Sequence, residues 1–228
     1  MKLKYIVSLL VLAVALNIHA QDTIERRAGI LNAKEQSVGL ATGIDYAIAP
    51  LQLNYKRGFT AFNYKFPVIL GAEVSIPMFA FDLNDISIKI TSETTILRKG
   101  NFEIRGGMNA VFVNAKLETE TMSSLGADFH VFTGLTSKKW TAGFTFNYNQ
   151  VFSTYIKHSD KYKDNVFADV VDGWYKNTAA NIRIGLLLNR TFGKIDVHIK
   201  AGASLTAKFN EYLFVPPLYG LLGVSYRF

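Results

Sequence analysis

The sequence predicts an all-β fold: an antiparallel, up-and-down transmembrane β-barrel of about ten strands, with eight or twelve as alternatives. Apolar and polar residues alternate with period two over most of the chain after residue 35, and successive residues of a strand point to opposite faces of a sheet. The alternating stretches are close to the roughly ten residues that a tilted strand needs to cross a bilayer. No mature segment has 18 consecutive apolar residues, so no transmembrane helix is expected.

The alternation is clearest in the second half of the chain, where Trp140 and Phe144 share one face of a stretch and Thr141 lies on the other. A helix would not produce this spacing. The first hairpin depends on a turn at Ala49-Pro50, and without that hairpin we would expect eight strands. The ten stretches are residues 38–48, 51–56, 66–76, 86–96, 102–112, 125–136, 140–148, 181–188, 195–205 and 218–228.

The N-terminal region has the pattern of a secretory signal peptide. Lys2 and Lys4 precede an apolar core at residues 6–16, and Ile18-His19-Ala20 is an acceptable cleavage site. The alternative is an N-terminal membrane anchor, although the apolar core is short for a spanning helix. We therefore expect a signal peptide at residues 1–20, a periplasmic tail at 21–34 and a barrel at 35–228.

The C-terminus and the lengths of the connections indicate the membrane in which the predicted barrel would lie. The final Tyr226-Arg227-Phe228 places an aromatic residue at the end of a strand, and it resembles the C-terminal signature of small outer-membrane β-barrels of Gram-negative bacteria. That resemblance implies contact with outer-membrane lipid and with the barrel-assembly machinery, which recognises such a strand. Connections at 98–101, 137–139 and 189–193 are short, whereas those at 79–85, 114–121, 151–177 and 207–216 are longer. Short periplasmic turns and longer extracellular loops are typical of this class.

A set of aromatic residues on the apolar face is expected to mark the membrane–water interface at the short-turn ends of the strands. Tryptophan and tyrosine rings favour the headgroup level of a bilayer. The predicted interface residues are Phe66, Phe102, Trp140, Tyr226 and Phe228.

The polar face carries acidic and basic residues in equal number, so we expect ion pairs to fill a narrow lumen and block a wide channel. A ring of one charge sign, as in a selective pore, is absent from the pattern. A narrow pore for small solutes remains the alternative. The predicted lumen network comprises Asp45, Glu73, Glu93, Glu103, Arg105, Asp128, His130, Arg183, Asp196, His198, Lys200 and Arg227.

Two Asp-x-His pairs, at Asp128 and His130 and at Asp196 and His198, could orient a histidine as a general base. This spacing and the strand number resemble the omptin proteases, but the paired Asp-x-Asp of that family is missing. A lipid-modifying barrel enzyme is a second distant alternative. We expect no catalytic residues, no cofactor and no metal site. Nucleic-acid binding is not expected, because the formal net charge of +7 is spread along the chain.

The connection at 151–177 is the longest, and long connections are usually functional or disordered. It mixes charges with aromatic rings, and we expect Asp172, Trp174 and Tyr175 to form a contact site for an unknown extracellular ligand. The alternative is a lid that packs over the barrel mouth. The sequence thus favours a non-enzymatic outer-membrane barrel with a role in surface contact or in the envelope.

Overall fold

The structure is a computed structural model of the 228-residue chain. It describes residues 27–45, 48–60, 66–78, 84–166, 169–206 and 216–228. The predicted signal peptide, the first part of the predicted tail and most of the connections at 79–85 and 207–216 therefore lie outside the described residues.

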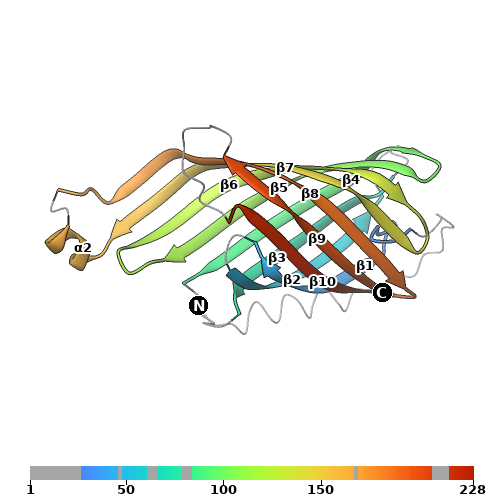
Figure 1. Ribbon diagram of the computed structural model, residues 1–228, viewed down its shortest axis with the longest axis horizontal. Coiled ribbons are helices and arrows are strands. Elements are labelled where there is room, and N and C mark those ends of the chain that lie inside the picture. Colours follow the sequence, from blue (N-terminus) through green and yellow to red (C-terminus); the bar gives the residue numbers. More distant parts are fainter. Residues whose placement is uncertain (1–26, 46–47, 61–65, 79–83, 167–168, 207–215) are drawn as a thin grey trace.

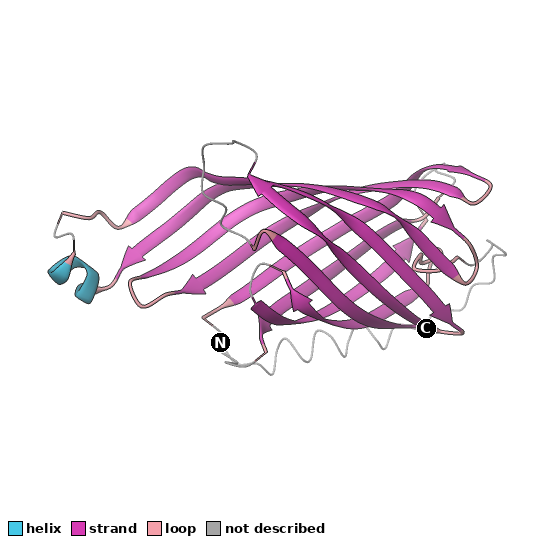
Figure 2. Ribbon diagram, in the orientation of Figure 1, coloured by secondary structure: helices cyan, strands magenta, loops and turns pink. Residues whose placement is uncertain are grey.

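The described residues form ten strands and one short helix, and the strands close into an antiparallel up-and-down barrel, as the alternation predicts (Figures 1 and 2). Each strand pairs with its neighbours in sequence, and β1 pairs with β10. The elements are β1 (Gln36–Ile44), β2 (Ile48–Phe59), β3 (Val68–Pro77), β4 (Ile86–Lys99), β5 (Phe102–Lys116), β6 (Glu120–Thr136), β7 (Trp140–His158), α2 (Asp160–Asn165), β8 (Gly173–Phe192), β9 (Ile195–Thr206) and β10 (Leu218–Arg227).

The closing pair of strands sets the direction of the barrel. Ser37 is opposite Arg227 and Ile44 is opposite Gly220, so β1 begins where β10 ends. The tight turns β4–β5, β6–β7 and β8–β9 lie at this same end, which we call the short-turn end (Figure 1). The opposite end carries the protruding hairpins described below.

The barrel has the reverse of the burial pattern of a water-soluble domain, whose interior is mainly apolar. Its largest fully buried side chains among the described residues are all polar: Arg227, Glu103, Thr136 and Thr141. Large apolar side chains cover the outside instead, and Phe144 and Ile90 are 63% and 58% exposed. No described helix is long and apolar enough to span a membrane.

The first hairpin is real, but the expected turn at Ala49-Pro50 is wrong. β1 ends at Ile44, and β2 already includes Pro50, whose register partner is Pro77. Two prolines can face each other here because they lie at the end of the ladder, where a missing N–H costs little. Asp45 consequently lies in the bend after β1 rather than on the strand.

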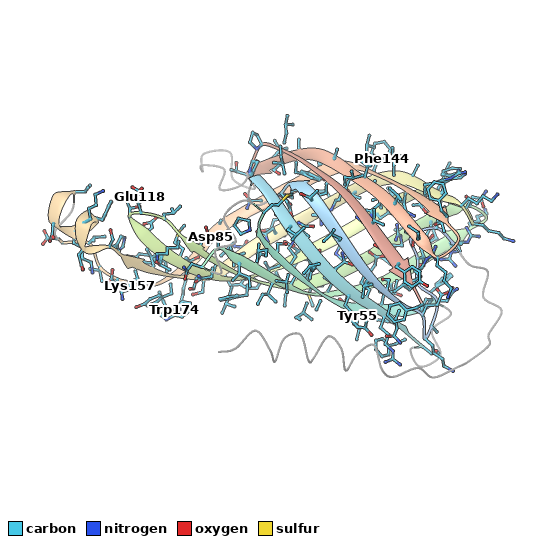
Figure 3. The ribbon with its side chains drawn as sticks, turned by 90° about the horizontal axis from the view of Figure 1, so that it is seen from below. Tyr55, Asp85, Glu118, Phe144, Lys157 and Trp174 are labelled. Carbon is cyan, nitrogen blue, oxygen red and sulfur yellow. The ribbon has the colours of Figure 1, made fainter. Side chains whose placement is uncertain are left out.

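Two of the expected long loops are largely strand, so the predicted alternation of short and long connections is wrong at these sites. β5 and β6 leave only residues 117–119 between them, and β7 and β8 shorten the 151–177 connection to 159–172. Within the described residues, 173–180 of β8 pair with β7 but not with β9. These two hairpins therefore project beyond the barrel, as Glu118, Lys157 and Trp174 show in Figure 3, while Tyr55 and Phe144 lie on the barrel itself.

Candidate functional site: the lumen and the protruding hairpins

Residues 27–35, just before β1, cross the short-turn end of the barrel. The Ala28 N–H donates to the Ser137 carbonyl (2.9 Å), and the Thr141 hydroxyl donates to the Ala28 carbonyl (2.8 Å). Ile30 and Leu31 are buried against Ile69 of β3. Gly29 has φ +69°, a conformation that favours glycine. This segment therefore forms a floor across one end of the lumen.

Arg227 connects this floor to the last strand. Its Nε and Nη2 lie 2.8 and 2.9 Å from the two carboxylate oxygens of Asp196. Its Nη1 donates to the carbonyls of Arg27 (3.2 Å) and Ile30 (3.3 Å). Arg227 is 1% exposed, and a buried charge of this kind requires such partners.

Two further acids are paired in the same half of the barrel. Glu103 is completely buried and accepts hydrogen bonds from Arg98 (2.8 Å) and from the Thr95 hydroxyl (2.6 Å). Glu93 pairs with Arg105, and the Arg105 Nη1 lies 3.0 Å from its carboxylate. The guanidinium of Arg105 also stacks over the ring of Phe132, 4.2 Å from the ring centre.

A second group of charges lies nearer the protruding hairpins. Asp45 pairs with Arg183 of β8 and accepts from the Gln52 amide (2.9 Å). Lys89 of β4 lies 3.0 Å from Glu73 and 3.7 Å from Asp45. The bend that places Asp45 after β1 thus brings its carboxylate to strands β4 and β8, across the lumen.

The remaining predicted lumen residues also line the interior. Asp128 accepts from the Asn149 amide, and the Lys200 ammonium donates to the Asn147 side chain at 3.4 Å. His198 lines the lumen cavity beside Lys200. The structure therefore places every residue of the predicted lumen network inside the barrel or at its mouth, although a functional role for them stays a prediction.

In both Asp-x-His pairs the aspartate has a partner other than the neighbouring histidine. Asp128 is bonded to Asn149, whereas His130 faces Glu93, with 3.4 Å between Nε2 and the carboxylate. Asp196 is held by Arg227 and by the Thr191 hydroxyl rather than by His198. The described residues also contain no cluster of three or more His, Cys, Asp or Glu side chains that could hold a metal ion.

A cavity of about 290 Å³ lies in the lumen, and both polar and apolar side chains line it. Charged groups of both signs belong to this lining, including Glu73, Glu93, Lys89 and Lys200. Gly29 and Leu31 of the floor segment also contribute to it. The cavity therefore reaches the floor.

The tip of the β7–β8 hairpin is held by charged groups around α2. Ser159 caps the helix by accepting from the Tyr162 N–H. Asp172 accepts from the Lys163 ammonium (2.7 Å) and from both the backbone and the ring Nδ1 of His158 (2.9 and 3.0 Å). The Lys163 hydrogen bond, supported by His158, lowers the pKa of Asp172 well below its usual range, and the same contact raises the pKa of Lys163.

The three residues expected to form one contact site do not face a common point. Asp172 is bonded inside the tip. Trp174 and Tyr175 are consecutive strand residues, so their side chains point to opposite faces. Trp174 contacts Tyr155, with 5.4 Å between ring centres, and is 61% exposed. The structure thus does not bring the three side chains to one face, because β8 continues through Trp174 and Tyr175. Their contact with a ligand stays a prediction.

The predicted interface aromatics lie at the short-turn end, as their positions in the strands require. Phe102 and Trp140 begin β5 and β7, and Tyr226 stacks with Phe228 at 6.3 Å between ring centres. Phe66 precedes β3 and lies under the guanidinium of Arg98 at 4.9 Å. No comparable pattern predicts the position of residues 27–35, although four of these nine residues are apolar: Ala28, Ile30, Leu31 and Ala33.

A scan against protein-family models and a search of curated proteins found no match for this chain.

Proposed function

We propose that the protein is an outer-membrane β-barrel of a Gram-negative envelope, exported by a signal peptide at residues 1–20. In this proposal the barrel has no enzymatic role and its lumen is closed. The β5–β6 and β7–β8 hairpins extend outside the cell and provide the contact surface. The short-turn end, with the floor segment, faces the periplasm.

The observation that carries the proposal is the belt of apolar side chains on the outside of a closed barrel. Ile90, Phe144 and Leu222, from three different strands, are each more than half exposed. Exposing such side chains to water costs about 25 cal/mol for every Å² of apolar surface. A hydrocarbon environment removes that cost, and a closed barrel satisfies the backbone groups that lipid cannot.

Two features support a closed lumen. Ion pairs point into the interior, such as those of Arg183 with Asp45 and of Arg105 with Glu93. The floor segment covers the short-turn end through Ala28 and Ile30. Both arrangements narrow the lumen, and they favour a closed barrel over the narrow-pore alternative.

Single-channel recording tests the closed lumen. We expect the purified barrel, inserted into a planar bilayer, to show no large and stable conductance. Steady openings of porin size would overturn the closed lumen and favour the narrow pore.

Cysteine labelling tests the location and orientation, because the chain has no cysteine of its own. A maleimide too large for porins should label Lys163→Cys, at the hairpin tip, on intact cells. It should label Lys99→Cys, at the β4–β5 turn, only after the outer membrane is permeabilised. Labelling of both on intact cells, or of neither until permeabilisation, would contradict the outer-membrane placement, and reversed labelling would contradict the orientation.

The protruding hairpins support a role in surface contact. They present Trp174 and Val171, which are 61% and 69% exposed, on a frame that is held by the contacts of Asp172. Exposed aromatic and apolar side chains are typical of contact surfaces. A contact surface on two faces of an extended hairpin replaces the single site that we expected from Asp172, Trp174 and Tyr175.

A further inference from the structure

The short-turn end carries a concentration of positive charge. The β4–β5 turn region contains Arg98 and Lys99, and the β6–β7 turn contains Lys138 and Lys139. Arg190 and Lys194 flank the β8–β9 turn. The acids nearest these turns, Glu103 and Asp196, are buried and already paired inside the barrel. Each of these three turns therefore presents bases without an exposed acid.

Several of these bases are available to a ligand. Lys99, Lys139, Arg190 and Lys194 are exposed, and none of the four has an ion pair within the part of the chain that the structure describes. Arg190 is the register partner of Trp140, so the two side chains share the outer face of the barrel. A cleft lined by Arg27, Lys138, Lys139, Trp140 and Arg190 lies between the turns.

These bases lie directly beside the rings of the apolar belt. The Lys194 ammonium lies 5.9 Å from the centre of the Tyr226 ring, and the Arg190 guanidinium lies 5.8 Å from that of Phe192. Tyr226 and Phe192 are both exposed on the outside of the barrel. The positive charges are thus located at the edge of the surface that would contact hydrocarbon, at the level where headgroups lie.

The opposite end has a different charge pattern. The protruding hairpins carry Glu118, Glu120, Asp160, Asp164, Asp169 and Asp172 together with Lys116, Lys157, Lys161, Lys163 and Lys176. Positive and negative groups are interspersed there, and Lys163 is paired with Asp172. Among the described residues, exposed bases without an exposed acid beside them are therefore gathered at the turns of the short-turn end.

We propose that the basic rim formed by Lys99, Lys138, Lys139, Arg190 and Lys194 binds the headgroups of anionic phospholipids in the leaflet that contacts the short-turn end. The binding is electrostatic, between Lys and Arg side chains and phosphate oxygens, with Trp140 and Tyr226 inserted beside the acyl chains. This inference rests on the proposed membrane location and adds a lipid preference to it.

Tryptophan quenching by brominated lipids tests the proposal, because the chain has only two tryptophans. Trp174→Phe leaves Trp140 in the basic rim as the only reporter. The folded barrel is placed in phosphatidylcholine vesicles that contain either dibrominated phosphatidylglycerol or dibrominated phosphatidylcholine. We expect the anionic quencher to be effective at a mole fraction about fivefold lower, the equivalent of one basic residue near an anionic surface.

Two matched triple variants in the Trp174→Phe background test whether the basic rim causes the preference for the anionic lipid. Lys139→Gln, Arg190→Gln and Lys194→Gln together should abolish most of the preference for the anionic quencher. The control is Lys116→Gln, Lys157→Gln and Lys176→Gln, which removes the same charge from exposed sites on the protruding hairpins and should leave the preference unchanged. Equal quenching by the two lipids, or a preference that survives in the rim variant, would overturn the inference.

The reciprocal variant separates this inference from the proposed function. Trp140→Phe leaves Trp174 on the protruding hairpin, where neither brominated lipid should quench it. If Trp140 is quenched equally by both lipids while Trp174 is not quenched, the membrane location stands and the lipid preference fails. If neither lipid quenches Trp140, both proposals fail.

Discussion

The two ends of the barrel hold their charged groups in different ways. At the short-turn end, Arg227 is 1% exposed, and its guanidinium connects Asp196 with the backbone of residues 27–30. At the protruding end, Asp172 accepts three hydrogen bonds, from Lys163 and His158, but the side chains of Asp172 and Lys163 are 27% and 32% exposed. Water therefore reaches the contact between Asp172 and Lys163, whereas it does not reach Arg227.

This difference determines what each end contributes. Breaking a buried charge pair leaves an unpaired charge without water, which is strongly destabilising. Breaking an exposed pair returns both groups to water at little cost. The short-turn end is therefore expected to determine global stability, and the tip of the β7–β8 hairpin is expected to open independently of the barrel.

The largest effect is expected from Asp196→Asn, which removes the carboxylate that pairs with Arg227. It should lower the free energy of unfolding by about 3–5 kcal/mol, because the guanidinium stays buried. Urea titration of the barrel in lipid vesicles, followed by tryptophan fluorescence, measures the loss. The matched change Asp172→Asn should have a much smaller effect, and equal losses would contradict the distinction between the two ends.

A smaller effect is expected from a charge on the outer face. Ile199 of β9 is 50% exposed on the belt, and Ile199→Arg should cost about 2–4 kcal/mol in a bilayer, because arginine is unfavourable in hydrocarbon. The yield of folded protein in vesicles, read from the gel mobility of unheated samples, checks this. Val171→Arg at the exposed tip is the control and should fold normally. Normal folding of the Ile199 variant would argue against a lipid-facing belt.

The smallest effect is the response of the β7–β8 hairpin tip to acidic pH. The pKa of Asp172 lies below its usual value of about 3.9, because Lys163 and His158 stabilise the carboxylate. Asp172 therefore stabilises the folded tip fully at any pH above the pKa of an unfolded aspartate. This stabilisation is lost as the pH falls through the lower pKa that Asp172 has in the folded tip. At pH 5, which is still above the unfolded value, the tip should be as protected as at pH 7.

Hydrogen–deuterium exchange of residues 159–166, corrected for the intrinsic effect of pH, measures this protection. Asp172→Asn should increase exchange of the tip at both pH values, while the β-strands of the barrel stay unchanged. An increase in exchange between pH 7 and 5 in the unaltered chain, without a matching increase in Asp172→Asn, would show that the Lys163 contact does not hold Asp172 ionised.

The sequence predicted the strands well where lipid and lumen impose different side chains on the two faces. Phe144 and Thr145 alternate because one faces outward and the other inward. Beyond the barrel, neither face has to be apolar, so Ser123 and Ser124 continue β6 without a visible period. The hairpins therefore looked like loops, although their backbone pairing is uninterrupted apart from the bulges.

The sequence could predict which side chains point into the lumen, but it could not predict which residues they pair with. Alternation indicates that Asp196 and His198 point inward, yet it carries no information about which strand lies across the lumen. The pairing of Asp45 with Arg183 depends on a bend after Ile44 and on barrel closure. The floor segment has no period at all, because its contacts are made by its backbone, at Ala28 and Ile30, rather than by a repeated side chain.

Residues 27–36 contact the last strand of the barrel, and this has a consequence for the time course of folding. The backbone of Arg27 contacts Arg227, 200 positions later in the chain. Gln36 likewise exchanges backbone hydrogen bonds with Phe228. Contacts of such long sequence separation form slowly, because a large loop must close before they stabilise anything. We therefore expect the contacts of Arg227 with the floor to form late in barrel assembly.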